Sequence, residues 1–187
     1  MTFRPTQRSL IAMNPLLKRL SGGDRRSIGN SLEVAADVLA NPNLFPDLFS
    51  GMLSDDPIIR MRAADAVEKV TVHNPILLKP LRKTLLTKVA LIDQQEIRWH
   101  CAQLFSRVEW TRPERTRIIT ILQDYLKDKS SIVRTFAMQA LGDIAARDSK
   151  LRKPIIKQLK ELTESGTPAM KTRGMKLLAG LLSPSMN

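Results

Sequence analysis

The chain has 187 residues and a net charge of +12, and 43% of its residues are apolar although only 4% are aromatic. With only eight glycines, this composition argues against a β-sandwich or barrel of short strands and turns, and the charge favours anionic partners such as nucleic acid, an acidic protein or a lipid surface. The single cysteine, Cys101, excludes an internal disulfide, and no segment approaches the ~18–20 consecutive apolar residues of a membrane span, so we expect a cytoplasmic protein.

The N-terminal segment 1–27 is basic, with Asp24 as its only acid. Its composition is compatible with an organelle transit peptide, but it also suits a first helix with a basic exposed face, which is the interpretation we favour. At the other end, the segment 149–187 has eight basic and two acidic residues. That segment therefore carries half of the net charge.

Four segments repeat one pattern with a period of about 37 residues. They are DDPIIRMRAADAVEKV (55–70), QQEIRWHCAQLFSRV (94–108), SSIVRTFAMQALGDI (130–144) and TPAMKTRGMKLLAGL (167–181), which align on Arg60, Arg98, Arg134 and Lys171. Apolar or small residues recur one position before the basic residue and three, six, seven and ten positions after it. These positions share one side of a helix that turns by about 100° per residue, so each segment is predicted to be an amphipathic helix.

Further helices are predicted between these segments, at 44–53, 75–92, 113–128 and 150–165. Pro75, Pro113 and Pro168 suit the first turn of a helix, where the missing N–H costs nothing. A weaker copy of the pattern surrounds Arg25. The predicted architecture is a single all-α domain over 1–187, with about ten helices in five pairs at approximately 8–40, 43–72, 75–110, 113–147 and 150–182.

Paired helices with a basic residue before an A-x-x-A/L-L-x-x-V/I stripe resemble the HEAT-repeat family, and DDPIIRMRAADAV is particularly similar to the second helix of that repeat. The resemblance covers residues 24–182. It implies a right-handed α-solenoid of the HEAT or armadillo kind, whose second helices line a concave surface and whose first helices form the convex one. The last copy departs from the pattern at Lys171 and Gly174, which suits a terminal, capping repeat.

The four aligned basic residues, Arg60, Arg98, Arg134 and Lys171, are predicted to form an inter-repeat ladder and not a ligand site. Asp55, Asp93 and Asp128 precede the basic residue of their own segment by five or six positions. Stacking of the repeats is expected to bring such acids within reach of the next repeat's arginine, as charge-assisted hydrogen bonds.

The side of the second helices opposite the apolar stripe is expected to be exposed and to bind a protein segment. A tryptophan is a preferred residue at binding hot spots and methionine adapts to varied partners. The candidate protein-binding residues are Met61, Trp99, Gln103, Met138, Gln139 and Met175. An equally weighted alternative for Trp99 is that it covers a neighbouring helix.

The first helices are expected to carry a basic surface that contacts phosphates without reading sequence. The candidate nucleic-acid-binding residues are Lys79, Arg82, Lys83, Arg112, Arg115, Lys153, Lys157 and Lys160. Non-specific nucleic-acid binding is therefore the alternative to protein binding. An ordinary solvated face is the other interpretation of these charges.

No phosphate loop, dinucleotide-binding glycine motif or nucleophile elbow occurs in the sequence, and the two histidines lack metal-ligand spacing. We expect no cofactor, no metal and no small-molecule substrate, a buried and inert Cys101, and a non-enzymatic scaffold. A further alternative is similarity to the HEAT-like alkylpurine DNA glycosylases, for which Trp99 and either Asp65 or Asp143 would be the counterparts of their site residues.

Overall fold

The computed structural model describes residues 14–24 and 26–183, and in that part every regular element is helical. The all-α fold class is confirmed. The α-helices are α1 (Pro15–Lys18), α2 (Ser31–Ala40), α3 (Phe45–Ser50), α4 (Pro57–His73), α5 (Arg82–Thr87), α6 (Gln95–Leu104), α7 (Arg112–Tyr125), α8 (Ser131–Arg147), α9 (Ser149–Ser165) and α10 (Pro168–Leu182). Short 3-10 helices are η1 (Pro42–Leu44), η2 (Gly51–Leu53), η3 (Pro75–Leu81) and η4 (Val89–Leu91). The interpretation of the segment before residue 14 lies outside the described residues.

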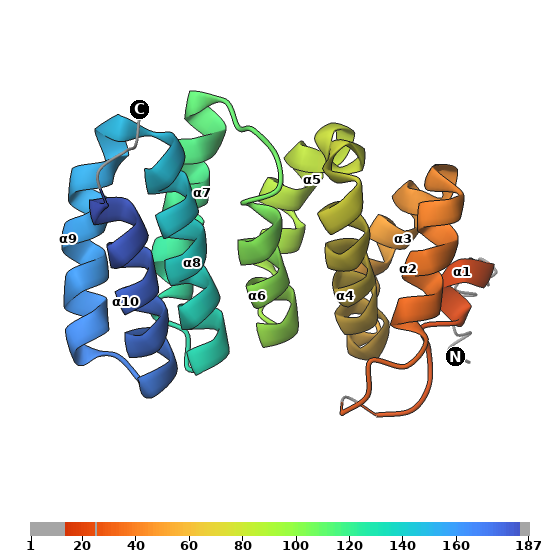
Figure 1. Ribbon diagram of the computed structural model, residues 1–187. Helices are drawn as coiled ribbons and strands as arrows, with labels where there is room; N and C mark the ends of the chain where they lie inside the picture. Colours follow the sequence, from red (N-terminus) through yellow and green to blue (C-terminus); the bar gives the residue numbers. More distant parts are fainter. Residues whose placement is uncertain (1–13, 25, 184–187) are drawn as a thin grey trace, which may run out of the picture.

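The helices that carry the repeated sequence pattern pack side by side in chain order. Helix α2 contacts α4, α4 contacts α6, α6 contacts α8 and α8 contacts α10, and we call these five the second helices. The α3 and η3–α5 segments, α7 and α9 precede them in the chain and pack against them. Figure 1 shows the resulting row, from α1 and α2 at one end to α9 and α10 at the other.

The apolar stripe of the second helices forms the core, as the sequence pattern predicts. One position before the basic residue, Ile59, Ile97 and Val133 are at most 2% exposed. The small position three residues after it is also buried in each repeat, and at Gly174 an added Cβ would lie 1.9 Å from Oγ1 of Thr163. A larger side chain at 174 would therefore push α10 away from α9.

The first helices of two repeats, predicted over 44–53 and 75–92, are divided into shorter elements. The first of these segments contains η1, α3 and η2, and the second contains η3, α5 and η4. Proline lacks the N–H donor of a regular α-helical turn, and Pro75 and Pro80 both lie in η3. The chain therefore begins this segment with 3-10 turns and forms α-helix only after Leu81.

The loop before α2 is attached to α4 by the guanidinium of Arg62. This side chain is 3% exposed and donates hydrogen bonds to five main-chain oxygens. The acceptors belong to Leu20, Ser21, Gly22, Asp24 and Ser27, at 2.6–3.3 Å. Gly29 has a φ of +52° and its added Cβ would lie 2.7 Å from Cζ of Arg62, so the loop needs glycine where it wraps around the guanidinium.

Candidate functional site

The inter-repeat ladder joins neighbouring repeats at two of its four positions. Arg98 donates to Asp128 at 2.6 Å and also approaches Asp93 at 3.1 Å, while Arg60 donates to the amide oxygen of Gln94 at 2.8 Å. The direction differs from the expectation, because Asp128 pairs with the arginine of the preceding repeat and not with that of the next one. A helical side chain leans toward the N-terminus of its own helix, so Arg98 reaches the turn that precedes the neighbouring α8.

The other two residues of the predicted ladder, Arg134 and Lys171, do not bridge repeats. Their assignment to the inter-repeat ladder is therefore wrong. Arg134 makes no side-chain hydrogen bond or ion pair with a described residue, and its buried Nε has no partner. The turn that follows α9 offers Gly166 and Thr167 in place of a carboxylate. Lys171 is exposed at the start of α10.

This difference predicts unequal effects of two matched substitutions. Arg98→Met is expected to lower the free energy of unfolding by about 2–3 kcal/mol, because it leaves the carboxylate of Asp128, whose side chain is 6% exposed, without its charged partner. Arg134→Met is expected to change it by less than about 0.5 kcal/mol. Urea unfolding followed by circular dichroism measures both values, and equal losses would contradict the assignment of Asp128 as the critical partner.

Two methionines that were expected to face a protein partner are buried. Met61 is 7% exposed and Met138 is 0% exposed. The prediction that these two side chains bind a partner is therefore wrong. The physical reason is the close packing of consecutive second helices, which covers the side of each helix next to its stripe. At Gly174 of α10, for example, an added Cβ would lie 3.2 Å from the methyl carbon of Met138.

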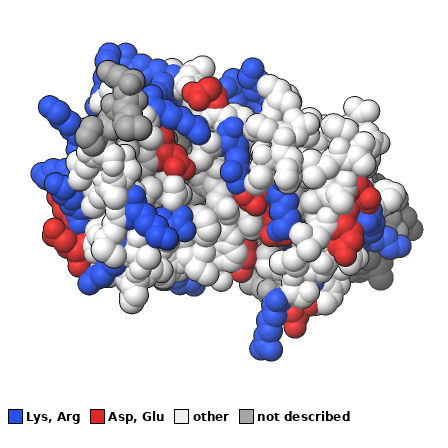
Figure 2. All heavy atoms as spheres, in the orientation of Figure 1, with Lys and Arg blue, Asp and Glu red and all other residues white. Residues whose placement is uncertain are grey.

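The remaining candidates on this face are accessible to different extents. Met175 is 60% exposed, whereas Trp99 is half-buried against the core and its ring centroid lies 5.6 Å from that of His100. The partial burial of Trp99 against the core agrees with the alternative that this side chain covers a neighbouring helix, although the ring contact with His100 lies within α6 itself. Figure 2 shows this face with charged groups of both signs among larger uncharged areas.

Gln103 and Gln139 line one groove, which crosses α6, α8 and α10 and which we call the second-helix groove. Its volume is about 270 Å³. Asp143 accepts hydrogen bonds from Ser106 at 2.6 Å and from Gln139 at 2.8 Å, and Arg173 donates to Gln139 at 2.7 Å. The lining residues are Ala102, Gln103, Ser106, Arg107, Phe136, Gln139, Asp143 and Arg173. A continuous chain of polar contacts thus connects α10 to the turn after α6.

The two guanidinium groups of the second-helix groove differ in their partners. Arg107 forms an ion pair with Glu68 of α4. Arg173 makes no ion pair with a described residue, and its guanidinium lies 5.8 Å from the ring centroid of Phe136. The N–H groups of Arg173 that do not bond Gln139 can therefore bind a carboxylate from outside.

Burial determines the charge of the groups beneath this face. Burial lowers the pKa of His100 to about 4, with opposing contributions from the nearby charges of Asp65 and Glu96, so the imidazole is neutral at pH 7 and approaches the Gln103 amide at 3.3 Å. Burial also raises the pKa of Cys101 to about 12, in agreement with an inert thiol.

The carboxylates considered for glycosylase-like chemistry are held by neighbouring side chains. Asp65 accepts hydrogen bonds from Ser31 and Lys69, and Asp143 accepts them from Ser106 and Gln139. Asp143 lines the second-helix groove, and Asp65 does not. The two carboxylates therefore do not share one site.

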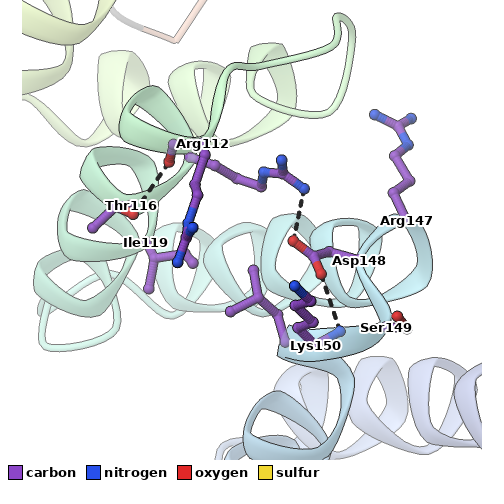
Figure 3. Close-up of a pocket in the computed structure, with 9 residues that line it drawn as sticks. Arg112, Thr116, Ile119, Arg147, Asp148, Ser149 and Lys150 are labelled. Carbon is purple, nitrogen blue, oxygen red and sulfur yellow. Dashed lines mark hydrogen bonds and ion pairs between the residues drawn. The ribbon is translucent and has the colours of Figure 1, made fainter.

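A second hollow, of about 500 Å³, lies between α7 and the start of α9, and we call it the basic hollow. Its charged residues are Arg112, Arg115, Arg147, Lys150 and Asp148. Figure 3 shows Asp148 between α7 and Lys150, while Arg147 extends away from the other labelled side chains. Arg115 bonds Asp148 at 2.7 Å, and Asp148 also caps α9 by accepting from the main-chain N–H of Lys150.

The other basic candidates are distributed over several elements. Lys153, Lys157 and Lys160 are exposed along α9, and Lys79 and Lys83 are exposed on η3 and α5. Arg82 is a structural residue, because it donates to the main-chain oxygen of Glu109 at 2.8 Å and its guanidinium lies 5.7 Å from the Trp110 ring centroid. Arg112 and Arg115 both line the basic hollow, and nothing in the sequence near those residues indicates a hollow shared with Lys150.

Comparisons with known proteins found no match for this chain among family models, curated proteins or solved structures. Within residues 14–24 and 26–183, no helix is long and apolar enough to cross a membrane. The same residues contain no group of three or more His, Cys, Asp or Glu side chains that could hold a metal ion.

Proposed function

We propose that the protein is a non-enzymatic scaffold, built as a HEAT-like right-handed solenoid, that binds a protein segment in the second-helix groove. The observation that carries this proposal is the groove itself, which continues across three consecutive second helices and offers donors, acceptors and one aromatic face together. Side-chain amides such as those of Gln103 and Gln139 both donate and accept hydrogen bonds, as the main chain of a peptide requires. A cytoplasmic location belongs to the proposal and is supported by the single, buried thiol of Cys101.

The chemistry of the groove favours an acidic segment. Arg173 lacks an ion-pair partner among the described residues, and a carboxylate can accept two parallel hydrogen bonds from a guanidinium. The net charge of +12 would in addition attract an acidic chain over longer distances. We therefore assign Arg173 as the anchor for an aspartate or glutamate of the partner.

Selection of a random displayed peptide library against the full chain tests this proposal. The selected peptides are expected to be rich in Asp and Glu, and Arg173→Gln is expected to weaken their binding by about tenfold, because a hydrogen bond to a charged group contributes about 1.5–3 kcal/mol. Fluorescence anisotropy measures the dissociation constant.

Lys171→Gln is the matched control, since it removes one exposed charge from the same helix outside the groove. Its affinity for the selected peptides should equal that of the wild type. Equal losses in both variants would indicate a general charge effect and overturn the groove assignment, as would a library that yields no acidic consensus.

A further inference from the structure

The basic hollow is distinct from the second-helix groove in its residues and its charge. It is formed by α7, the last residue of α8 and the first turn of α9, and four of its nine lining residues are cations against one acid. Arg115 neutralises Asp148 through their 2.7 Å contact. Arg112 and Lys150 are therefore left without an ion-pair partner among the described residues, whereas Arg147 approaches Glu109 outside the hollow at 4.0 Å. The unpaired cations give the hollow a positive potential that a cleft focuses.

Arg112 and Lys150 are the two cations of the hollow that are open to an external anion. Both are exposed, and neither forms an ion pair with a described residue. Arg147 donates to the main-chain oxygen of Ser106 at 2.9 Å and approaches Glu109 at 4.0 Å, and Figure 3 shows its side chain directed away from the other labelled side chains. The N-terminus of α9 is already capped by Asp148, so cationic side chains, and not the helix end, give the hollow its affinity for anions.

The charge of the hollow continues along α9 as a lysine stripe, formed by Lys150, Lys153, Lys157 and Lys160. All four side chains are exposed and none forms an ion pair with a described residue. At 1.5 Å per residue the stripe is about 15 Å long, which matches roughly four successive phosphates of one nucleic-acid strand. A single small anion would occupy only the hollow, so the stripe favours a polymer of phosphates.

We propose that the basic hollow and the lysine stripe of α9 bind the phosphate backbone of a nucleic acid without reading its sequence. The apolar residues that line the hollow are Ile119 and Leu151, and no aromatic residue lines it. Sequence-tolerant stacking of bases requires aromatic faces, so contact here is limited to phosphate and sugar. Glu161 and Glu164 are exposed beyond Lys160, and their negative charges end the stretch of α9 that attracts phosphates.

Fluorescence anisotropy with fluorescein-labelled single-stranded and double-stranded DNA of mixed sequence tests this proposal over a series of KCl concentrations. About five phosphate contacts, from the stripe and Arg112, give an expected slope of about −4.5 in a plot of log affinity against log salt for the duplex. The double variant Arg112→Gln/Lys150→Gln is expected to bind at least tenfold more weakly at low salt, and its slope should be smaller in magnitude by about 2.

The matched control is Lys171→Gln/Lys176→Gln, which removes the same charge from exposed residues of α10 outside the hollow. It should retain wild-type affinity and slope, as should Arg173→Gln in the second-helix groove, and melting curves of all variants confirm that they fold. Equal losses in both double variants, or no binding to DNA at low salt, would overturn the proposal. A second experiment measures binding to vesicles that contain phosphatidylserine at the same phosphate concentration as the DNA. Stronger binding to the vesicles than to DNA would overturn the proposal and assign the hollow to a membrane surface.

Discussion

Replacing Arg62 with methionine is expected to lower the free energy of unfolding by about 2–4 kcal/mol and to detach the loop over residues 20–27 from α4. The guanidinium is 3% exposed and is hydrogen-bonded to five main-chain oxygens of that loop. A hydrogen bond to a charged donor contributes about 1.5–3 kcal/mol, but the five losses do not add, because a detached loop can bind water. Methionine keeps an unbranched side chain about as long as the aliphatic stem of arginine, so the effect reports the loss of the guanidinium.

Urea unfolding measures the loss, and amide hydrogen exchange shows whether the loop opens before the rest of the protein. Arg62→Lys is the informative companion, because an ammonium has three donors and cannot reproduce the planar fork that reaches five carbonyls. It should recover less than half of the lost stability. An Arg62→Met protein with unchanged unfolding free energy and unchanged exchange in 20–27 would show that the loop is held by other contacts.

Stability is expected to fall by about 3 kcal/mol between pH 6.5 and pH 4 through His100 alone. Burial lowers the pKa of this histidine from its ordinary 6.5 to about 4, so in this range the unfolded chain takes up a proton that the folded protein does not. Stability therefore rises with pH, by about 1.4 kcal/mol per unit at most. The contribution is fully present above the unfolded pKa and is lost as the pH falls toward the folded one.

The contribution of His100 is separated from that of the carboxylates by its glutamine variant. His100→Gln keeps a polar side chain beside Gln103, and it should be less sensitive to acid than the wild type, so that the difference between their unfolding free energies changes by about 3 kcal/mol from pH 6.5 to pH 4. Chemical unfolding at half-unit pH intervals gives both curves. A constant difference across this interval would show that His100 titrates with the same pKa in the folded and unfolded chains.

The positions of the buried stripe could be read from the sequence because they depend on local periodicity. Ile59, Ile97 and Val133 recur at one place in the pattern, and an amphipathic helix must bury that place wherever it packs. Trp110 is also held by a contact that is local in the chain, since it is 8% exposed and its indole N–H donates to the main-chain oxygen of Phe105 at 2.7 Å. Such features need only short-range information.

The exposed and buried polar positions were harder to predict, since they depend on what lies beside each helix. Arg60 and Arg62 are two residues apart in the same helix, but Arg60 reaches Gln94 in the next repeat and Arg62 is enclosed by the loop before α2. Met138 is apolar and lies on the side expected to face a partner, yet it is covered where α8 meets α10. Periodicity identifies one buried side of a helix and does not show whether a second side is buried as well.

By itself, the sequence determined the helical class, the repeat of about 37 residues, the stripe that forms the core and the excess of positive charge. Only the tertiary structure decided which charges are paired and which meet in a hollow: Arg98 with Asp128, Arg173 without a carboxylate, and Arg112 opposite Lys150. The reason is the range of the interactions involved. Helix formation and amphipathicity act over a few neighbouring residues, whereas each of these sites is assembled from residues about 30 or more positions apart in the chain, brought together by packing between repeats.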